Sequence, residues 1–151
     1  MNGIAPGTWV VVADSEKALF LENVGEADHP HFRVRRKKEQ ENPPHRDQAA
    51  NRPGRYHDSG PNQKSAHEET DFHELAKDRF ASELAEMLYH RAHNNLFSKL
   101  ILVAAPEVLG ALRKEMHKTV VERVIAEVPK ALTHVPLDQL EERLAKDVGQ
   151  G

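Results

Sequence analysis

The chain has 151 residues, a formal net charge of -3 and no cysteine. This length suits one domain with a sizeable core. The lack of cysteine excludes disulfides, thiol catalysis and thiolate metal sites, and the charge is not that of a general polyanion binder. The first residues do not form a secretory signal, and no apolar run reaches the roughly 20 residues of a membrane span. We therefore expect a single cytoplasmic domain over residues 1–151, without a membrane span.

Three strands are predicted in the first part of the chain. Residues 8–13 are almost continuously apolar, which predicts a buried strand that ends at Asp14. A short turn separates this strand from a second apolar stretch at 18–24, so the two strands should be antiparallel neighbours. Residues 32–35 alternate apolar and basic side chains. This alternation predicts an edge strand with one buried face and one cationic face.

A long polar segment follows the third predicted strand. Between Val34 and Phe72 there is no Leu, Ile, Val, Met or Phe, whereas proline and glycine recur. Such a segment cannot bury enough apolar surface to offset the entropy lost when it becomes ordered. We therefore predict a mobile polar loop at about 36–68, and loops of this length inside a compact domain are commonly functional.

A long helix and a central strand are predicted next. Asp71 and Glu74 have the spacing of a capping box, and apolar residues then recur at three- and four-residue intervals until about residue 95. The uninterrupted apolar run at 100–105 leaves no polar face, so a strand here must be covered on both sides. The order helix, buried strand, helix indicates a sheet packed between helices.

The last part of the chain should contain a helix, a strand and a second helix. The first helix is expected from Glu107 to about Arg123. The end of this stretch is ambiguous, because Val120, Val121, Val124, Ile125 and Val128 fit a helix by spacing and a strand by β-branching. We assign residues 124–128 to a strand that Pro129 ends. A C-terminal helix with leucines along one side begins after Pro136.

Five short motifs, in order along the chain, resemble a known family. They are the stretches 9–15, 69–74 and 79–81, the stretch 102–110 around its proline, and the stretch 126–134. Together they are similar to the bacterial host-attachment protein family, whose members are described as required for attachment to host cells. The resemblance covers nearly the whole chain outside the polar loop.

That family is in turn similar to the central domain of archaeal and eukaryotic peptide release factors. The similarity implies a three-layer α/β fold, in which a mixed five-stranded sheet of ribonuclease-H-like topology has helices on both faces. In release factors, the loop between the third strand and the long helix carries a Gly-Gly-Gln motif that reaches the ester of peptidyl-tRNA. The 36–68 loop lacks this motif, and its nearest sequence is Gly-Pro-Asn-Gln at 60–63. A solvated Gln63 fits this loop better than a catalytic one.

Basic residues gather on the third predicted strand and in the loop after it. A cationic strand face joined to an Arg-rich loop could hold RNA phosphates, and a tyrosine in the loop could stack on a base. The alternative is an edge strand protected by its charge, next to a solvated segment. The candidate nucleic-acid-binding residues are Arg33, Arg35, Arg36, Lys37, Arg46, Arg52, Arg55, Tyr56 and Gln63.

Other chemistries lack a complete set of residues in the sequence. Asp14 ends the first strand, where a ribonuclease-H-like nuclease has a metal carboxylate, but two-metal chemistry needs several carboxylates. A turn role for Asp14 is therefore predicted. His90 and His93 lie one helical turn apart without the partners of a metal site, and no nucleophile elbow or phosphate-binding glycine loop is present. We expect no catalytic residue, no metal and no cofactor.

The sequence favours a non-enzymatic, translation-related factor that contacts RNA, the ribosome or tRNA through its basic loop. The first alternative is an adhesion or attachment-related module with a protein partner, as the family name implies. The second is an esterase that acts on peptidyl-tRNA. The sequence leaves the oligomeric state open.

Overall fold

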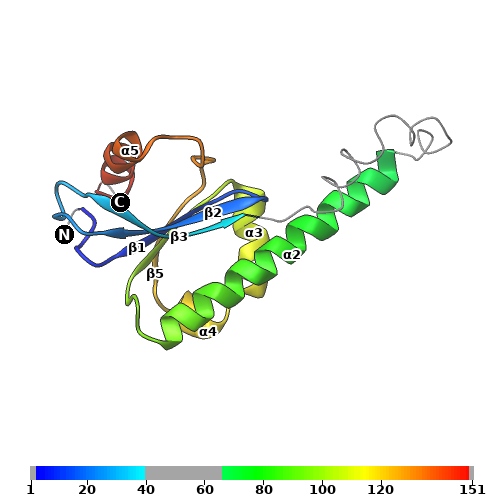
Figure 1. Cartoon of the computed structure of the whole chain (residues 1–151), viewed down its shortest axis with the longest axis horizontal. Helices are drawn as coiled ribbons and strands as arrows, with labels where there is room; N and C mark the ends of the chain where they lie inside the picture. The colour runs from blue at the N-terminus through cyan, green and yellow to red at the C-terminus, as the bar shows by residue number, and fades with distance from the viewer. Residues whose placement is uncertain (1–2, 40–65, 150–151) are drawn as a thin grey trace.

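The computed structural model describes residues 3–39 and 66–149 (Figure 1). Five strands form one mixed sheet in the order β3-β2-β1-β4-β5. This confirms the expected α/β class, and the strand order and directions are those of the ribonuclease-H-like topology. The elements are β1 (Trp9–Ala13), β2 (Lys17–Asn23), β3 (Phe32–Glu39), α2 (Ala66–His93), β4 (Leu100–Val103), α3 (Pro106–Glu115), α4 (Lys118–Val121), β5 (Val124–Val128) and α5 (Leu137–Gly149).

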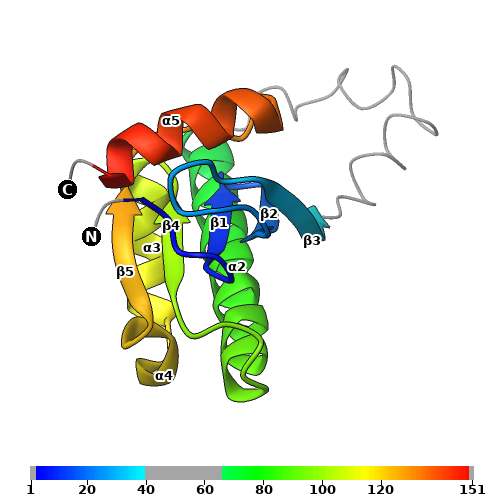
Figure 2. The ribbon, with the colours of Figure 1, turned by 90° about the vertical axis from the view of Figure 1, so that its left-hand side faces the viewer.

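Strand β1 is the centre of the sheet. It pairs antiparallel with β2, where Trp9 lies opposite Glu22, and parallel with β4, where Trp9 lies opposite Leu100. All five residues of β1 are buried, because α2, α3 and α4 cover one face of the sheet and α5 lies on the other (Figures 1 and 2). The outer strands β3 and β5 are the two edges of the sheet.

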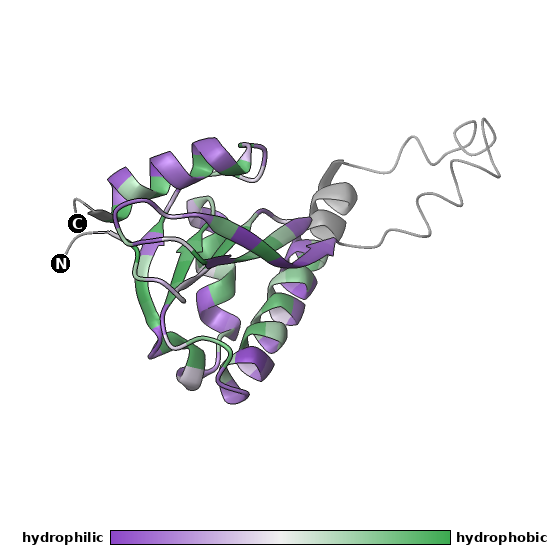
Figure 3. Ribbon diagram, turned by 60° about the vertical axis from the view of Figure 1, so that its left-hand side comes forward, coloured by the Kyte–Doolittle hydropathy of each residue, from purple (hydrophilic) through white to green (hydrophobic). Residues whose placement is uncertain are grey.

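Two apolar clusters hold the three layers together. Successive β1 residues point to opposite faces, so Val11 packs towards α2 and α3 whereas Val10 and Val12 pack towards α5. Leu84 of α2 and Leu140 of α5 are nearly completely buried in these clusters. Burying one such side chain stabilises the fold by about 2 kcal/mol. In Figure 3, hydrophobic residues predominate in the central strands, whereas hydrophilic residues lie along the outer side of α5.

The ends of the predicted 36–68 loop are regular structure. Strand β3 continues to Glu39 and α2 begins at Ala66, so the loop prediction is wrong for 36–39 and 66–68. Its remaining positions lie outside the described residues. The N-terminal part of α2 extends beyond the sheet (Figure 1). Leu75, one of the apolar residues that recur at three- and four-residue intervals, is 64% exposed there.

The helix expected to run to Arg123 is two helices. Met116 has extended backbone angles (φ -73, ψ 135), which end α3. His117 then begins α4, because its Nδ1 accepts the backbone N–H of Thr119 at 3.1 Å. The strand predicted at 124–128 is confirmed as β5. The helix predicted after Pro136 is α5, and at its start the backbone N–H of Leu140 donates to the carbonyl oxygen of Pro136. Within residues 3–39 and 66–149, no helix has the length and apolar character that a membrane crossing requires.

Candidate nucleic-acid interface

A β-bulge shapes the basic strand β3. Phe20 of β2 lies opposite Arg36 and the next residue, Leu21, lies opposite Val34, so Arg35 is an extra residue in β3. Arg36 therefore shares the face of Phe20, which α2 covers, whereas Val34 shares the face of Leu21. The prediction of one buried and one cationic face is wrong, since the bulge interrupts the alternation and Val34 is 46% exposed.

Two of the candidate cations on β3 are paired with carboxylates. Arg35 Nη2 lies 2.6 Å from Glu22 Oε1, and its Nε donates to the same oxygen at 2.7 Å. Lys37 Nζ lies 3.4 Å from a carboxylate oxygen of Glu39, two residues along the strand. Both cations are exposed, so each pair contributes at most about 1 kcal/mol to stability.

The other two candidate cations on β3, Arg33 and Arg36, are exposed and form no ion pair with a side chain of residues 3–39 or 74–149, the side chains that the structure describes. The basic side chains of β3, which point to both faces of the sheet, thus lie along the surface of one edge strand. We call this surface the cationic edge. It consists of Arg33, Arg35, Arg36, Lys37 and Lys38.

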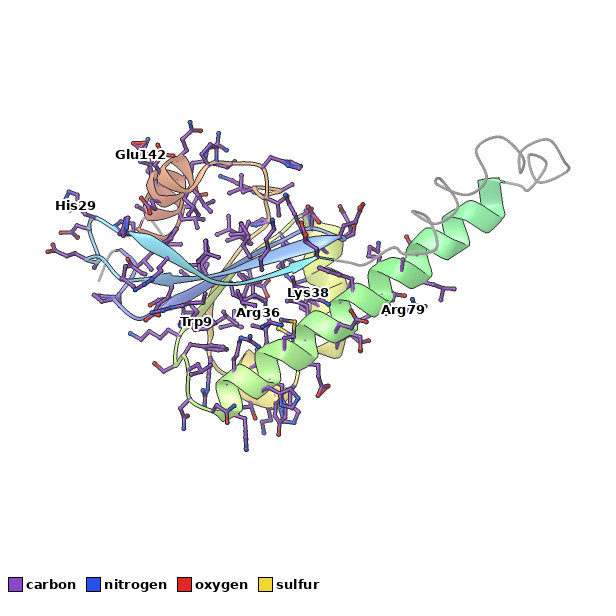
Figure 4. The ribbon with its side chains drawn as sticks, in the orientation of Figure 1. Trp9, His29, Arg36, Lys38, Arg79 and Glu142 are labelled. Carbon is purple, nitrogen blue, oxygen red and sulfur yellow. The ribbon has the colours of Figure 1, made fainter. Side chains whose placement is uncertain are left out.

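Lys38 belongs to the cationic edge although it was not among the candidate site residues. Its Nζ lies 2.8 Å from Glu83 Oε1 on α2 and 5.1 Å from the centre of the Phe80 ring. The ammonium group is therefore neutralised by a carboxylate and also makes a cation–π contact with the ring. Figure 4 labels Lys38 between β3 and α2.

Arg91 of α2 is a basic residue near the cationic edge that the sequence reasoning missed. Its Cζ lies 5.0 Å from the centre of the Phe20 ring, and its Nη1 donates to the carbonyl oxygen of Met87 at 3.4 Å. Burial, followed by the charge of Arg36, lowers the pKa of Arg91 from its ordinary value. Its i+4 spacing from Met87 places both on one flank of α2, but only the folded sheet brings Arg36 to that flank.

The loop candidates cannot be placed in this surface. Strand β3 leads into their segment and α2 follows it in the chain. The candidates that lie outside the described residues are Arg46, Arg52, Arg55, Tyr56 and Gln63.

Asp14 has the turn role that the sequence predicted. Its Oδ1 accepts the backbone N–H groups of Glu16 and Lys17 at 2.7 and 2.8 Å. Its Oδ2 accepts the hydroxyl of Thr133 at 2.8 Å, which ties the β5–α5 connection to the end of β1. In the described part of the chain, no group of three or more His, Asp or Glu side chains is arranged to hold a metal ion.

Replacing Thr133 with Val should remove the hydrogen bond that its hydroxyl donates to Asp14. Thr133 is buried, and the isosteric change deletes one hydrogen bond to a carboxylate, so we expect a loss of about 1.5 to 2 kcal/mol in the free energy of unfolding. Urea denaturation monitored by circular dichroism measures this loss. The control is Ser98→Ala, which removes an exposed hydroxyl between α2 and β4, and equal stabilities for both variants would contradict a role for the Asp14 contact.

An acidic hollow lies beside the start of β3, where the backbone N–H of Phe32 donates to Glu141 of its lining. It has a volume of about 360 Å³ and lies between the β2–β3 turn and α5. Two of its residues, His29 and Glu142, are labelled in Figure 4. The carboxylates of this hollow would repel phosphate, so of these two surfaces the cationic edge is the better one for RNA. The lining residues are Asp28, His29, Pro30, Asp138, Glu141, Glu142, Ala145 and Lys146.

Comparison with known proteins gives one family match. The family model described as "Bacterial archaeo-eukaryotic release factor family 12" matches residues 7–144. That description names release factors and does not name host attachment. Among curated proteins, no match was found.

Proposed function

Because the chain belongs to bacterial archaeo-eukaryotic release factor family 12, we propose that it is a translation-related factor that binds RNA through the cationic edge. The RNA would be that of the ribosome or of tRNA. The observation that carries this proposal is the exposure of Arg33 and Arg36 on an edge strand, without a carboxylate partner among the described residues. Guanidinium groups of this kind bind phosphates in nucleic acids.

Edge protection explains only part of the cationic edge. Charged side chains on an edge strand prevent pairing with other sheets, and this role is compatible with ion pairs such as those of Arg35, Lys37 and Lys38. Neutralised pairs contribute little to phosphate binding. The cations without such partners, Arg33 and Arg36, are therefore the ones that favour RNA as the ligand.

The proposed role is binding and not hydrolysis. The segment after β3 lacks the Gly-Gly-Gln sequence that the resemblance associates with cleavage of peptidyl-tRNA. We expect the Gln63→Ala variant to bind ribosomes as the unmodified chain does. Hydrolysis of peptidyl-tRNA by the unmodified chain, lost in Gln63→Ala, would support the esterase alternative instead.

Co-sedimentation of the purified protein with ribosomes tests the proposal. We expect binding at low salt that weakens steeply as salt rises, because contacts to phosphates release counterions. A variant with Arg46, Arg52 and Arg55 changed to Ala, run beside it, measures what the following segment adds. Absence of binding at low salt would contradict the proposal and would make the attachment-related alternative, with a protein partner, the preferred one.

A further inference from the structure

Two cations of β3, Lys38 and Arg36, face α2. One of them meets a negative charge on that helix and the other meets a positive charge. Lys38 meets the carboxylate of Glu83 at 2.8 Å. Arg36 instead lies opposite Phe20, whose ring is 5.0 Å from the guanidinium of Arg91, and the charge of Arg36 lowers the pKa of Arg91. Glu83 and Arg91 are two helical turns apart on the same flank of α2, so the helix presents a carboxylate to one strand cation and a guanidinium to the other.

Phe20 brings the two arginines together. It lies directly opposite Arg36 in the β2–β3 register. The Cζ of Arg91 lies over its ring, 5.0 Å from the ring centre. The contact of Arg91 with the carbonyl oxygen of Met87 further fixes that guanidinium. Neither arginine forms an ion pair with a side chain of residues 3–39 or 74–149, so their mutual repulsion is not offset by a described carboxylate.

We propose that Arg36 and Arg91 together bind one phosphate group between β3 and α2. A phosphate oxyanion offsets the repulsion between two guanidinium groups, and each group can donate two parallel hydrogen bonds to it. Because Arg91 is already held by Phe20 and Met87, little side-chain freedom is lost on binding. The assignment of this phosphate to an RNA backbone rests on the proposed function, whereas the phosphate site itself does not.

Thermal unfolding of the full chain tests the site with inorganic phosphate as the probe. At matched ionic strength, phosphate should raise the Tm of the unmodified protein above its value in chloride. Arg91→Met keeps an apolar side chain over Phe20 but removes the charge, and it should lose most of this increment. The matched control is Lys146→Gln on α5, which also removes one exposed charge and should keep the increment.

Charge reversal gives a second, opposite readout. Arg91→Glu would place a carboxylate near Arg36, as Glu83 is placed near Lys38. We expect a higher Tm than the unmodified protein in chloride, and no phosphate increment. If phosphate raises the Tm of the unmodified protein, Arg91→Met and Arg91→Glu by the same amount, the proposed phosphate site is wrong.

Ribosome binding distinguishes the two sources of the phosphate group. If the phosphate belongs to RNA, Arg91→Met should lower ribosome affinity about tenfold and reduce the salt slope by roughly 1. A phosphate increment that depends on Arg91, together with unchanged ribosome binding in Arg91→Met, would assign the site to free phosphate. A phosphate increment without any ribosome binding would support the site and contradict the proposed function alone.

Discussion

A triple variant with Arg33, Arg36 and Lys37 changed to Gln should bind ribosomes about 100-fold more weakly than the unmodified chain. These three side chains are exposed, and two of them have no carboxylate partner among the described residues. Removing up to three phosphate contacts should also lower the slope of log affinity against log salt by about 2 to 3. Co-sedimentation over a series of salt concentrations measures both quantities.

The control for this variant removes the same charge elsewhere. Lys114, Arg143 and Lys146 are exposed on α3 and α5, and changing all three to Gln gives the same net charge as the triple variant on β3. We expect the control to bind nearly as well as the unmodified chain. If both triple variants lose the same affinity, binding depends on overall charge and not on the cationic edge.

The largest loss of stability is expected for Asn23→Leu, at about 3 kcal/mol or more. Asn23 is completely buried at the end of β2. Its Nδ2 donates to the carbonyl oxygen of Ile4 at 2.6 Å, and its Oδ1 accepts the backbone N–H groups of Gly25 and His31, both at 2.9 Å. Leucine has a similar volume but leaves all three backbone groups without this partner.

Urea denaturation of Asn23→Leu measures this loss. The matched control is Asn94→Leu, an exposed position after α2, where we expect a change within about 0.5 kcal/mol. Because Asn23 organises the turn that leads into β3, the variant should also weaken ribosome binding under conditions that favour partial unfolding. Equal stability of the two variants would contradict the role of Asn23 as the centre of this turn.

The apolar patterns of the sequence predicted most of the core, with Leu75 of α2 as an exception. The runs at 9–13 and 100–103 are buried on both faces, as continuous apolar stretches require. Pro106 and Pro136 mark the starts of α3 and α5 because a proline fits the first turn of a helix. These signals are local, so no knowledge of the tertiary structure was needed to read them.

The details of the candidate site depend on contacts between distant residues. The bulge at Arg35 appears only when β3 is aligned with β2, and the backbone N–H at the start of β3 is held by Glu141 of α5, 109 residues away (Phe32 N to Glu141 Oε2, 2.7 Å). The proximity of Arg91 to Arg36 likewise follows from how α2 packs on the sheet. Lys37 and Glu39 are two residues apart in one strand, so their pair is local. The partners of Arg35 and Lys38 come from β2 and α2, so no pattern within β3 could predict that these two cations are neutralised.

The most direct test of the cationic edge as an RNA-binding surface is an NMR titration of the ¹⁵N-labelled protein with a short single-stranded RNA. At 17.0 kDa the chain is suited to assignment of its backbone amides. We expect the largest shift changes at residues 33–38 and around Arg91, changes that disappear at high salt, and none along the acidic surface of α5. Shift changes centred on α5, or no changes at low salt, would contradict RNA binding at this edge.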